Sequence, residues 1–385
     1  MHSVRKKILW LASWYPNRED PFDGDFIQRH AQAAALYNDI HVIVVKESKS
    51  VESTEIDTSE SEGLKEQVIY YKSKSGVLSG LNKQLKWRKV YLSAIKEYIK
   101  VYGKPDLIHV HVPWKAGLIA LELKNRWGIP FIVTEHWGIY NTVLKDNYFS
   151  KPFYFKLALK LIYRNVRLLI SPSEYLAKSI QSSIVPLDYV IIPNVVDTSV
   201  FHLNLKKHSK FTFLHVSNMV PLKNVDGIIS AFKKLIEVNN LNDVQLVLVG
   251  KKENSYLENA SKTGLLNKNI FFKGEIAYAD VAIEMQYAHC LVLNSKMENS
   301  PCVIGEALCC GLPVIATKVG GIPELIHPSN GILIEKNQSD ILAESMLCMF
   351  NSYSSFNLLS IAEEASIRFN YNNIGLLHHK VYQSF

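Results

Sequence analysis

Cysteine is scarce in this chain of 385 residues and absent from its first half. The five cysteines are Cys290, Cys302, Cys309, Cys310 and Cys348. Their number is odd, and neither a C-x-x-C pair nor a Cys/His spacing typical of a metal site occurs. We interpret them as reduced core thiols of a cytosolic protein.

Long apolar runs are also lacking, since no segment approaches the ~20 apolar residues that a membrane-spanning helix needs. The start, MHSVRKKILWLASWYP, resembles a signal peptide because basic residues precede an apolar run. That run, Ile8 to Tyr15, is short, is broken by Pro16, and leads to charged residues without a clear cleavage site. We therefore expect a first β-strand here.

Two glycine-rich nucleotide loops are missing. A G-x-G-x-x-G loop occurs neither at 11–24 nor at 217–227, which argues against a nicotinamide-dependent oxidoreductase. A G-x-x-x-x-G-K-[ST] loop is absent as well, which argues against an NTPase. No nucleic-acid recognition motif occurs, so only the charge favours a nucleic-acid partner, and we expect none.

The charge that is present is unevenly spread. The net charge is +7, from 43 Lys and Arg against 36 Asp and Glu. Basic residues exceed acidic ones by about seven through residue 200, so the second half is near neutral. A basic first half suits an acidic partner, such as a phosphorylated acceptor or an anionic membrane surface.

Short apolar runs alternate with helical patterns twice along the chain. In the first half, strands are predicted at 7–14, 40–45, 106–112, 130–134, 167–171 and 189–193, and helices at 25–37, 83–102, 115–127, 152–165 and 173–182. The pattern restarts with strands at 211–217, 244–249, 270–273, 290–294, 313–317 and 331–334, and helices at 224–239, 278–288, 301–310 and 338–350. This alternation is typical of parallel sheets covered on both faces.

The sequence thus predicts an α/β protein of two doubly wound, Rossmann-like domains, at 1–200 and 205–369, joined through a polar segment at 195–210. The Ser- and acid-rich segment 47–63 is expected to be a solvated loop. Ligands of open α/β sheets bind outside the carboxyl ends of the strands. We therefore expect the site in a cleft between the two domains.

The stretch 295–324, SKMENSPCVIGEALCCGLPVIATKVGGIPE, is the most informative one. A helix is predicted after Glu298, capped by Asn299 or Ser300, with Pro301 in its first turn and Gly311 at its end. The N-terminus of such a helix binds anions, for example a diphosphate. Within the helix, an apolar environment obliges the Glu306 carboxylate to have a partner, either within the protein or among the vicinal hydroxyls of a ligand.

Glu298 and Glu306 form E-x7-E, followed by A-L-C-C-G-L-P-V-I-A-T and V-G-G-I-P-E. This run resembles the signature of glycosyltransferase family 4, the retaining transferases of the GT-B fold. Other segments are similar in the same order: SWYP and PFDGDF at 13–26, DLIHVH and TEHWG at 106–138, IPNVVDTSVF at 192–201, LKNVD at 222–226 and NNIGLLHHKVY at 372–382. The last resembles a helix at 370–385 that packs back on the first domain.

The resemblance implies a donor site in the second domain and an acceptor site in the first. Glu306 would bind the donor ribose, Lys223 and Asn218 the diphosphate, and Gly24 would give the phosphate room. Asn218 departs from the Arg that is common in the family and supplies no charge. Without the family, Lys223 can equally be a solvated lysine at a helix start.

The resemblance also implies which residues contact the transferred sugar. His136 and Glu298 would lie at the reaction centre, and the sugar-binding group is Glu298, Asn299, Ser300, Cys302 and Val303. The substrate would be a nucleotide-diphospho-sugar, transferred with retention, and no metal or other cofactor is expected.

For several other residues a structural role is the simpler interpretation than a functional one. His109 and His111 share one face of a strand, where a core histidine is the more common case. The Cys309–Cys310 pair is interpreted as core packing, and the His378–His379 pair as surface and not a metal site.

The acceptor is expected to be a glycan or a lipid-linked acceptor, in cell-surface polysaccharide or glycolipid synthesis. Segments 83–104 and 151–167 mix basic and aromatic residues at helical spacing. Such helices bind anionic membranes, or they pack their aromatic face on the core. The first alternative predicts a cytoplasmic protein bound at the inner face of a membrane.

Two other functions stay open from the sequence. A nucleotide-sugar epimerase can share the GT-B architecture, and isomerised free nucleotide-sugar would distinguish it. A non-catalytic scaffold that binds sugar nucleotides is conceivable because of Asn218. Loss of the catalytic site is disfavoured by the presence of Glu298, Glu306, Lys223 and His136.

Overall fold

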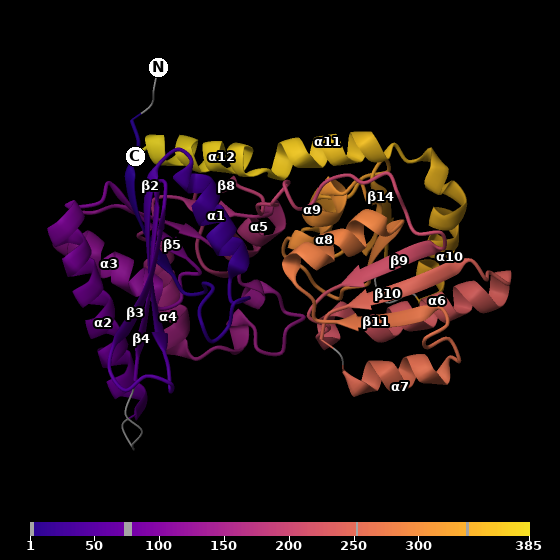
Figure 1. Cartoon of the computed structure of the whole chain (residues 1–385). Coiled ribbons are helices and arrows are strands. Elements are labelled where there is room, and N and C mark those ends of the chain that lie inside the picture. The colour runs from indigo at the N-terminus through magenta and orange to yellow at the C-terminus, as the bar shows by residue number, and fades with distance from the viewer. Residues whose placement is uncertain (1–3, 73–78, 252, 336–338) are drawn as a thin grey trace. The chain divides into compact units, whose positions relative to one another are not determined.

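The structure is a computed structural model that describes residues 4–72, 79–251, 253–335 and 339–385 (Figure 1). The chain divides into two units, Met1–Val195 with Tyr371–Phe385, and Val196–Asn370. The division falls a few residues before the predicted one, inside the segment that was expected to join the domains. No helix among the described residues is long and apolar enough to cross a membrane.

Unit 1, residues 1–195 and 371–385, contains an eight-stranded sheet in the order β3-β4-β2-β1-β5-β6-β7-β8. Its strands are β1 Lys7–Ala12, β2 Asp39–Glu47, β3 Glu55–Ser61, β4 Leu64–Tyr71, β5 Leu107–His111, β6 Phe131–Thr134, β7 Leu169–Ser171 and β8 Tyr189–Ile191. All neighbours pair in parallel except β3 and β4. Its helices are α1 Asp25–Ala35, α2 Ser79–Tyr102, α3 Ala116–Trp127, α4 Phe153–Tyr163, α5 Glu174–Ser183 and α12 Tyr371–Gln383.

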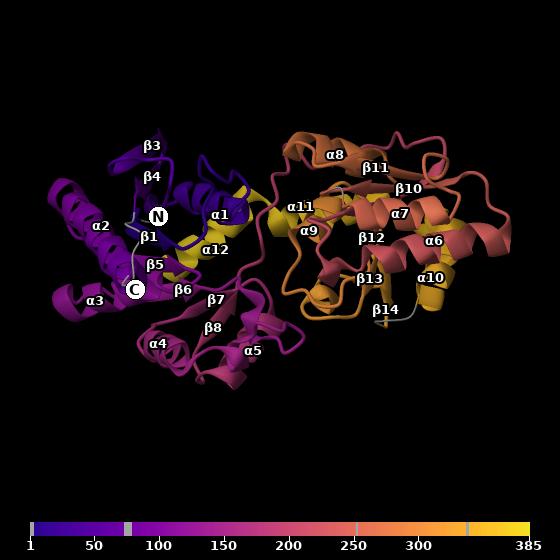
Figure 2. The same ribbon diagram turned by 90° about the horizontal axis from the view of Figure 1, so that it is seen from below.

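Both faces of this sheet are covered, as the apolar strands predict. In β1, Leu9 and Leu11 belong to the core beneath α2, α3, α4 and α5, while Ile8 and Trp10 belong to the core beneath α1 and α12. Figure 2 shows these two groups of helices on opposite sides of the strands. A sheet buried on both faces leaves its strand ends as the place for polar side chains.

Unit 2, residues 196–370, contains a six-stranded parallel sheet in the order β11-β10-β9-β12-β13-β14. Its strands are β9 Phe211–Val216, β10 Val244–Val249, β11 Ile270–Gly274, β12 Cys290–Leu293, β13 Val314–Thr317 and β14 Gly331–Ile334. Its helices are α6 Val225–Asn239, α7 Asn254–Lys262, α8 Tyr278–Tyr287, α9 Cys302–Cys309, α10 Ser339–Ser352 and α11 Leu358–Phe369. Helices α6, α7 and α10 cover one face, and α8, α9 and α11 the other.

The predicted fold class of two doubly wound α/β domains is confirmed, but the predicted elements omit β4, α7 and α11, and one predicted loop is wrong. Segment 47–63 is not a loop throughout, because β3 pairs with β4 along its whole length. Every residue of β3 is exposed, so this edge strand lacks the apolar alternation from which a strand is recognised. Its backbone hydrogen bonds to β4 stabilise it instead.

The cysteines are only partly core residues. Cys290, Cys309 and Cys310 are buried, Cys302 is half-buried and Cys348 is exposed, and all five are free thiols. Burial raises the pKa of the Cys309 thiol to about 12, which keeps it uncharged. The core interpretation is thus confirmed for the Cys309–Cys310 pair and wrong for Cys348.

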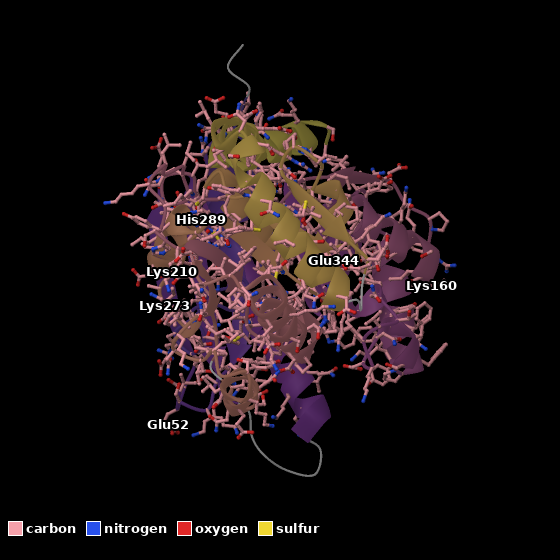
Figure 3. All side chains as sticks on the ribbon, turned by 90° about the vertical axis from the view of Figure 1, so that its right-hand side faces the viewer. Glu52, Lys160, Lys210, Lys273, His289 and Glu344 are labelled. Carbon is pink, nitrogen blue, oxygen red and sulfur yellow. The ribbon has the colours of Figure 1, made fainter. Side chains whose placement is uncertain are left out.

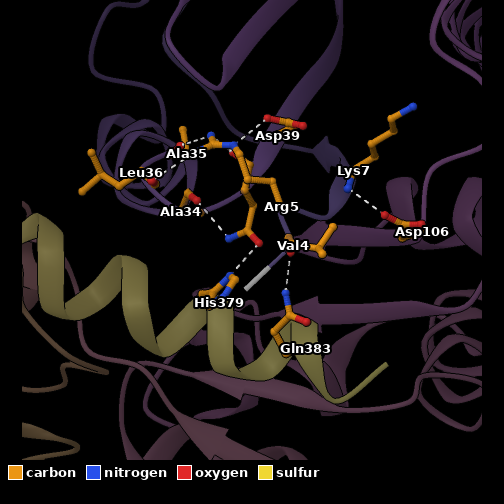
Figure 4. A network of polar contacts seen from close by, with 11 residues as sticks. Val4, Arg5, Lys7, Ala34, Ala35, Leu36, Asp39, Asp106, His379 and Gln383 are labelled. Carbon is orange, nitrogen blue, oxygen red and sulfur yellow. Dashed lines mark hydrogen bonds and ion pairs between the residues drawn. The ribbon is translucent and has the colours of Figure 1, made fainter. Parts of the chain in front are cut away.

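Helix α12 packs on α1 at very short range. A Cβ atom at Gly375 would lie 2.2 Å from the carbonyl oxygen of Ala33, so only glycine permits this approach. Polar contacts hold the two ends of the chain here: Gln383 donates to the Val4 carbonyl at 2.9 Å, and His379 Nδ1 lies 3.0 Å from Asn38 Oδ1 (Figure 4). His378 and His379 are both buried, so their prediction as surface residues is wrong.

The close contact at Gly375 predicts that Gly375→Ala lowers the free energy of unfolding of unit 1 by about 1–3 kcal/mol, because α12 must move off α1. Denaturant unfolding measured by tryptophan fluorescence tests this, since all six tryptophans lie at or before Trp137. Lys380→Ala, at an exposed position of α12, is the matched control. Equal midpoints for the two variants would contradict the packing argument.

Candidate functional site

In unit 2 the polar residues gather where the strand order reverses. From β9 the chain adds β10 on one side of the sheet, while β12 pairs on the other side of β9. Loops that leave two such neighbouring strands in opposite directions open a crevice at their carboxyl ends. The loop after β9 carries Lys223, and the loop after β12 carries Glu298.

These two loops bring an ammonium and a carboxylate into contact. Lys223 Nζ lies 2.5 Å from Glu298 Oε1, and the Ser295 hydroxyl donates to the same oxygen at 2.7 Å. Both side chains are largely covered, with 20% of Lys223 and 10% of Glu298 exposed. The predicted phosphate contact and the predicted sugar contact therefore lie within the length of one ligand.

Two glycines after β13 hold the backbone of Glu298. Gly320 has φ +56°, and a Cβ atom there would lie 1.7 Å from the Glu298 carbonyl oxygen. The N–H of Gly321 donates to that oxygen at 3.3 Å. Gly320 was not among the predicted site residues, although the V-G-G triplet at 319–321 is a sequence signal of a close backbone approach.

A chain of hydrogen bonds shapes the turn before Lys223. His215 Nδ1 lies 2.8 Å from the carbonyl oxygen of Val292, so this nitrogen carries the ring proton. Nε2 then accepts from the Ser217 hydroxyl, whose oxygen accepts from the N–H of Met219. Burial lowers the pKa of His215 to about 4, which keeps this proton arrangement.

Two features of this turn concern the predicted phosphate contacts. Met219 is buried with φ +55°, a backbone conformation that non-glycine residues rarely adopt. Asn218, next to it, is exposed. The N–H of Lys296 donates to the carbonyl of Leu222 at 2.8 Å, which ties the turn to the loop of Glu298.

Helix α9 begins at Cys302 with Pro301 in the N-cap position, so the predicted caps Asn299 and Ser300 are wrong. Pro301 suits the extended N-cap backbone with its φ of −70° and has no N–H to satisfy. Gly311, predicted at the helix end, has φ +66° just after the C-cap. The N–H groups of its first turn lie at the positive end of the helix dipole.

Glu306 is buried on α9, as its apolar neighbours predict. The hydroxyl of Tyr278 on α8 donates to its Oε1 at 3.1 Å. One partner within the protein is thus a neutral hydroxyl, which the sequence did not predict. A carboxylate has about four acceptor positions and can accept several hydroxyls at once.

In unit 1, a buried carboxylate organises the loop that carries His136. Glu135 accepts the N–H groups of His136 and Trp137, both at 2.9 Å, and the hydroxyls of Tyr140 and Tyr163 at 2.7 and 3.0 Å. Burial raises the pKa of the Glu135 carboxyl, and these four hydrogen bonds oppose the rise. Glu135 is part of the T-E-H-W-G motif, but the sequence did not predict this positioning role.

His136, which is half-buried, lies in a cluster with four buried histidines from β5, α1 and α12. Its ring lies 5.8 Å from that of His30 and stacks 6.2 Å from that of His111. His109 contacts Thr134 and Tyr382 through its two nitrogens, and His378 Nε2 lies 3.1 Å from His30 Nδ1. Burial lowers the pKa of His30 to about 4, and it lowers the pKa values of His109, His111, His136 and His378 well below the usual value.

Gly24 is the N-cap of α1, with φ +69°. A Cβ atom there would lie 2.8 Å from the backbone of Trp14. The glycine is therefore required by the close folding of the 14–24 loop on itself, and its predicted phosphate contact stays a prediction. The same holds for the predicted role of His136 beside the transferred sugar.

Within the described ranges, no group of three or more His, Cys, Asp and Glu side chains could hold a metal ion. The expected metal independence of the reaction stays a prediction.

Comparison with known proteins gives two adjacent family matches. Residues 31–200 match a model described as Glycosyltransferase Family 4, and residues 199–358 match one described as Glycosyl transferases group 1. An uncharacterized glycosyltransferase of Methanocaldococcus jannaschii is 30% identical over 250 residues, which are 64% of this chain and 66% of that protein. A candidate teichuronic acid biosynthesis glycosyltransferase of Bacillus subtilis is 25% identical over 372 residues, 88% of each chain.

Among solved structures, Anabaena HepE in complex with UDP has the same fold. The TM-score is 0.74 at 19% identity, covering 98% of this chain and 100% of that one. The likeness shows the fold alone, and it agrees with the two α/β units described above.

The buried histidines predict that unit 1 loses stability in acid. Each has a pKa near 6.5 when unfolded and a lower one when folded, so the unfolded chain binds more protons below pH 6.5. The free energy of unfolding has its full value above pH 6.5. It falls by about 1.4 kcal/mol per pH unit for each histidine as the pH drops toward 4. Denaturant midpoints from tryptophan fluorescence between pH 7.5 and 4.5 measure this fall.

His111→Phe is the matched variant for this experiment. Neither ring nitrogen of His111 has a hydrogen-bond partner among the described residues, so a similar apolar ring removes one titrating group at little structural cost. The slope of stability against pH should decrease by one histidine's share. A midpoint that stays constant from pH 7.5 to 5 in the wild type would refute the prediction.

Replacing Glu135 with Gln should lower the free energy of unfolding of unit 1 by about 2–3 kcal/mol, because the amide turns one acceptor into a donor among four donors. The same fluorescence measurement checks this. Glu97→Gln, which alters an exposed pair with Lys100, is the control and should cost nothing measurable. A Glu135→Gln midpoint equal to that of the control would remove the positioning role.

Proposed function

We propose a donor and a reaction for this chain from the premise that it belongs to the GT-B glycosyltransferases, since family models of glycosyltransferases match residues 31–200 and 199–358. The donor is a nucleotide-diphospho-sugar bound in unit 2. The acceptor is a glycan or a lipid-linked molecule of cell-surface polysaccharide or glycolipid synthesis. The Bacillus subtilis relative named for teichuronic acid biosynthesis supports this class of acceptor.

The observation that carries the donor proposal is the contact between Lys223 and Glu298. A bound diphosphate needs a cation, and a hexose hydroxyl a few ångströms away needs a hydrogen-bond acceptor. Lys223 and Glu298 supply these two groups, with Nζ and Oε1 2.5 Å apart. When a donor binds, its phosphate would take the ammonium and its sugar would take the carboxylate. The existing ion pair keeps both groups in position until then.

The leaving group of the reaction is a nucleoside diphosphate, which gains negative charge as the glycosidic bond breaks. Lys223 and the N-terminal N–H groups of α9 would stabilise that charge. Asn218 supplies only a hydrogen bond in this role, so Lys223 carries the charge compensation, with Lys251 after β10 as a candidate second cation. The buried Glu306 would bind the ribose hydroxyls beside Tyr278.

Retention follows from the family's front-face route. The bond from the sugar's anomeric carbon to the phosphate oxygen breaks, and the bond to the acceptor oxygen forms on the same face. The acceptor's proton passes to the departing phosphate oxygen. This route needs neither a protein nucleophile nor a metal ion, and His136 is proposed to contact the sugar.

UDP is the first nucleotide to test, because the similarly folded HepE was solved with UDP. The epimerase and scaffold alternatives are not favoured, since the reported relatives are named as glycosyltransferases.

The proposal predicts that one of UDP, GDP and ADP raises the melting temperature of the wild type, because a ligand that binds only the native state stabilises it. Glu306→Ala should abolish the shift, and Lys223→Ala should reduce it. Glu344→Ala, on the exposed side of α10, is the matched control and should keep the full shift (Figure 3). No shift with any nucleotide, or an undiminished one in Glu306→Ala, would refute the donor site.

A further inference from the structure

Helix α4 is apolar on two opposite sides. Its inner side packs into the core of unit 1 through the buried residues Phe155, Leu159, Ile162 and Tyr163. A surface helix normally turns polar residues outward on the other side. In α4 that outer side is apolar as well.

Four large apolar side chains make up the outer face of α4. They are Phe153, Tyr154, Leu157 and Leu161, exposed by 77%, 65%, 53% and 47%. At about 100° per residue they fall within an arc of roughly 100° on the helix. Phe149, 52% exposed, continues the apolar surface just before the helix. Contiguous exposed apolar surface of this kind marks a site of interaction.

The charged residues of the sequence around α4 have one sign. Between residues 147 and 173 the sequence has no Asp or Glu, and it has the basic residues Lys151, Lys156, Lys160, Arg164 and Arg167. Lys156 and Lys160 follow one flank of the apolar arc, since they lie one turn apart on the helix. Figure 3 labels Lys160 at the surface of this helix. An apolar stripe with basic flanks is complementary to an anionic lipid surface.

The other basic and aromatic helix, α2, does not share this arrangement. Its residues Tyr91 and Tyr98 are buried in the core of unit 1, and Trp87 packs partly against it. The aromatic residues Tyr91 and Tyr98 of α2 therefore serve the fold, whereas Phe153 and Tyr154 of α4 are exposed to solvent.

Helix α4 also adjoins the strand ends of unit 1. On its inner side Phe155 contacts Trp114, which follows β5, at 4.2 Å between ring centroids, and Trp137, which follows β6, at 6.1 Å. Lys151 lies 5.8 Å from the ring of Trp137. Helix α4 therefore lies beside partly exposed tryptophans at the edge where ligands of an α/β sheet bind.

We propose that the outer face of α4 binds the surface of an anionic lipid bilayer, with Phe153, Tyr154, Leu157 and Leu161 inserted among the lipids and Lys156, Lys160 and Arg164 on the headgroups. The proposal rests on α4 alone and does not require the donor assignment. It places an acceptor attached to a lipid next to the strand ends of unit 1.

Co-sedimentation of the full-length protein with vesicles tests this. The protein should bind vesicles of phosphatidylcholine with phosphatidylglycerol, bind those of phosphatidylcholine alone much more weakly, and release from the anionic ones as salt is raised. Phe153→Ser/Leu157→Ser/Leu161→Ser should abolish binding. Lys160→Gln and Arg164→Gln should each weaken it roughly five-fold.

The matched control carries the same kind of change elsewhere. Leu359→Ser/Ile367→Ser alters two exposed apolar side chains of α11 and should bind vesicles as the wild type does. Tryptophan fluorescence and the nucleotide-induced shift in melting temperature, measured on every variant, show whether unit 1 is folded and whether the donor site is intact. Failure of the membrane proposal is thereby separated from failure of the donor proposal.

Three results would overturn the proposal. The first is no binding of the wild type to anionic vesicles at low salt. The second is equal binding of the triple serine variant and the α11 control. The third is a concentration-dependent dimer that the triple variant loses while vesicle binding is unchanged, which would assign the α4 face to a second copy of this chain.

Discussion

Burial of both faces of the two sheets is the constraint on which the rest of the structure depends. A strand such as β1 has Leu9 and Leu11 in one core and Ile8 and Trp10 in the other, so its body has no place for chemistry. Polar and charged side chains gather where the strands end, because there the backbone leaves the sheet and water returns. Lys223 and Glu298 follow neighbouring strands for this reason, and in unit 1 His136 follows β6.

Much of this could be predicted from the sequence, because apolar runs of strand length and amphipathic helices repeat along the chain. What could not be predicted depends on contacts between distant segments. Strand β3 is exposed throughout and exists only through its pairing with β4. The buried state of His378 and His379 depends on α1, which lies more than three hundred residues earlier in the chain.

The candidate site shows the same limit. The sequence motif predicts that Glu298, Glu306 and Lys223 matter, and their types suggest what they bind. It does not predict that Lys223 contacts Glu298, that Tyr278 contacts Glu306, or that Gly320 must be a glycine to support the Glu298 backbone. Glu135 illustrates the point in unit 1, since its four donors come from its own loop and from α4.

The position of α12 in the chain has a consequence for biosynthesis. Residues 371–385 complete unit 1, yet they follow all of unit 2 in the chain. When the ribosome has made residues 1–195, α1 therefore still lacks α12, the helix that covers it. All of unit 2 must be synthesised before α12 emerges. During this interval the nascent chain exposes the apolar surface around Ile374's future position, where chaperones would bind and premature association would start. Translation that stops before residue 371 leaves unit 2 complete and unit 1 unfinished.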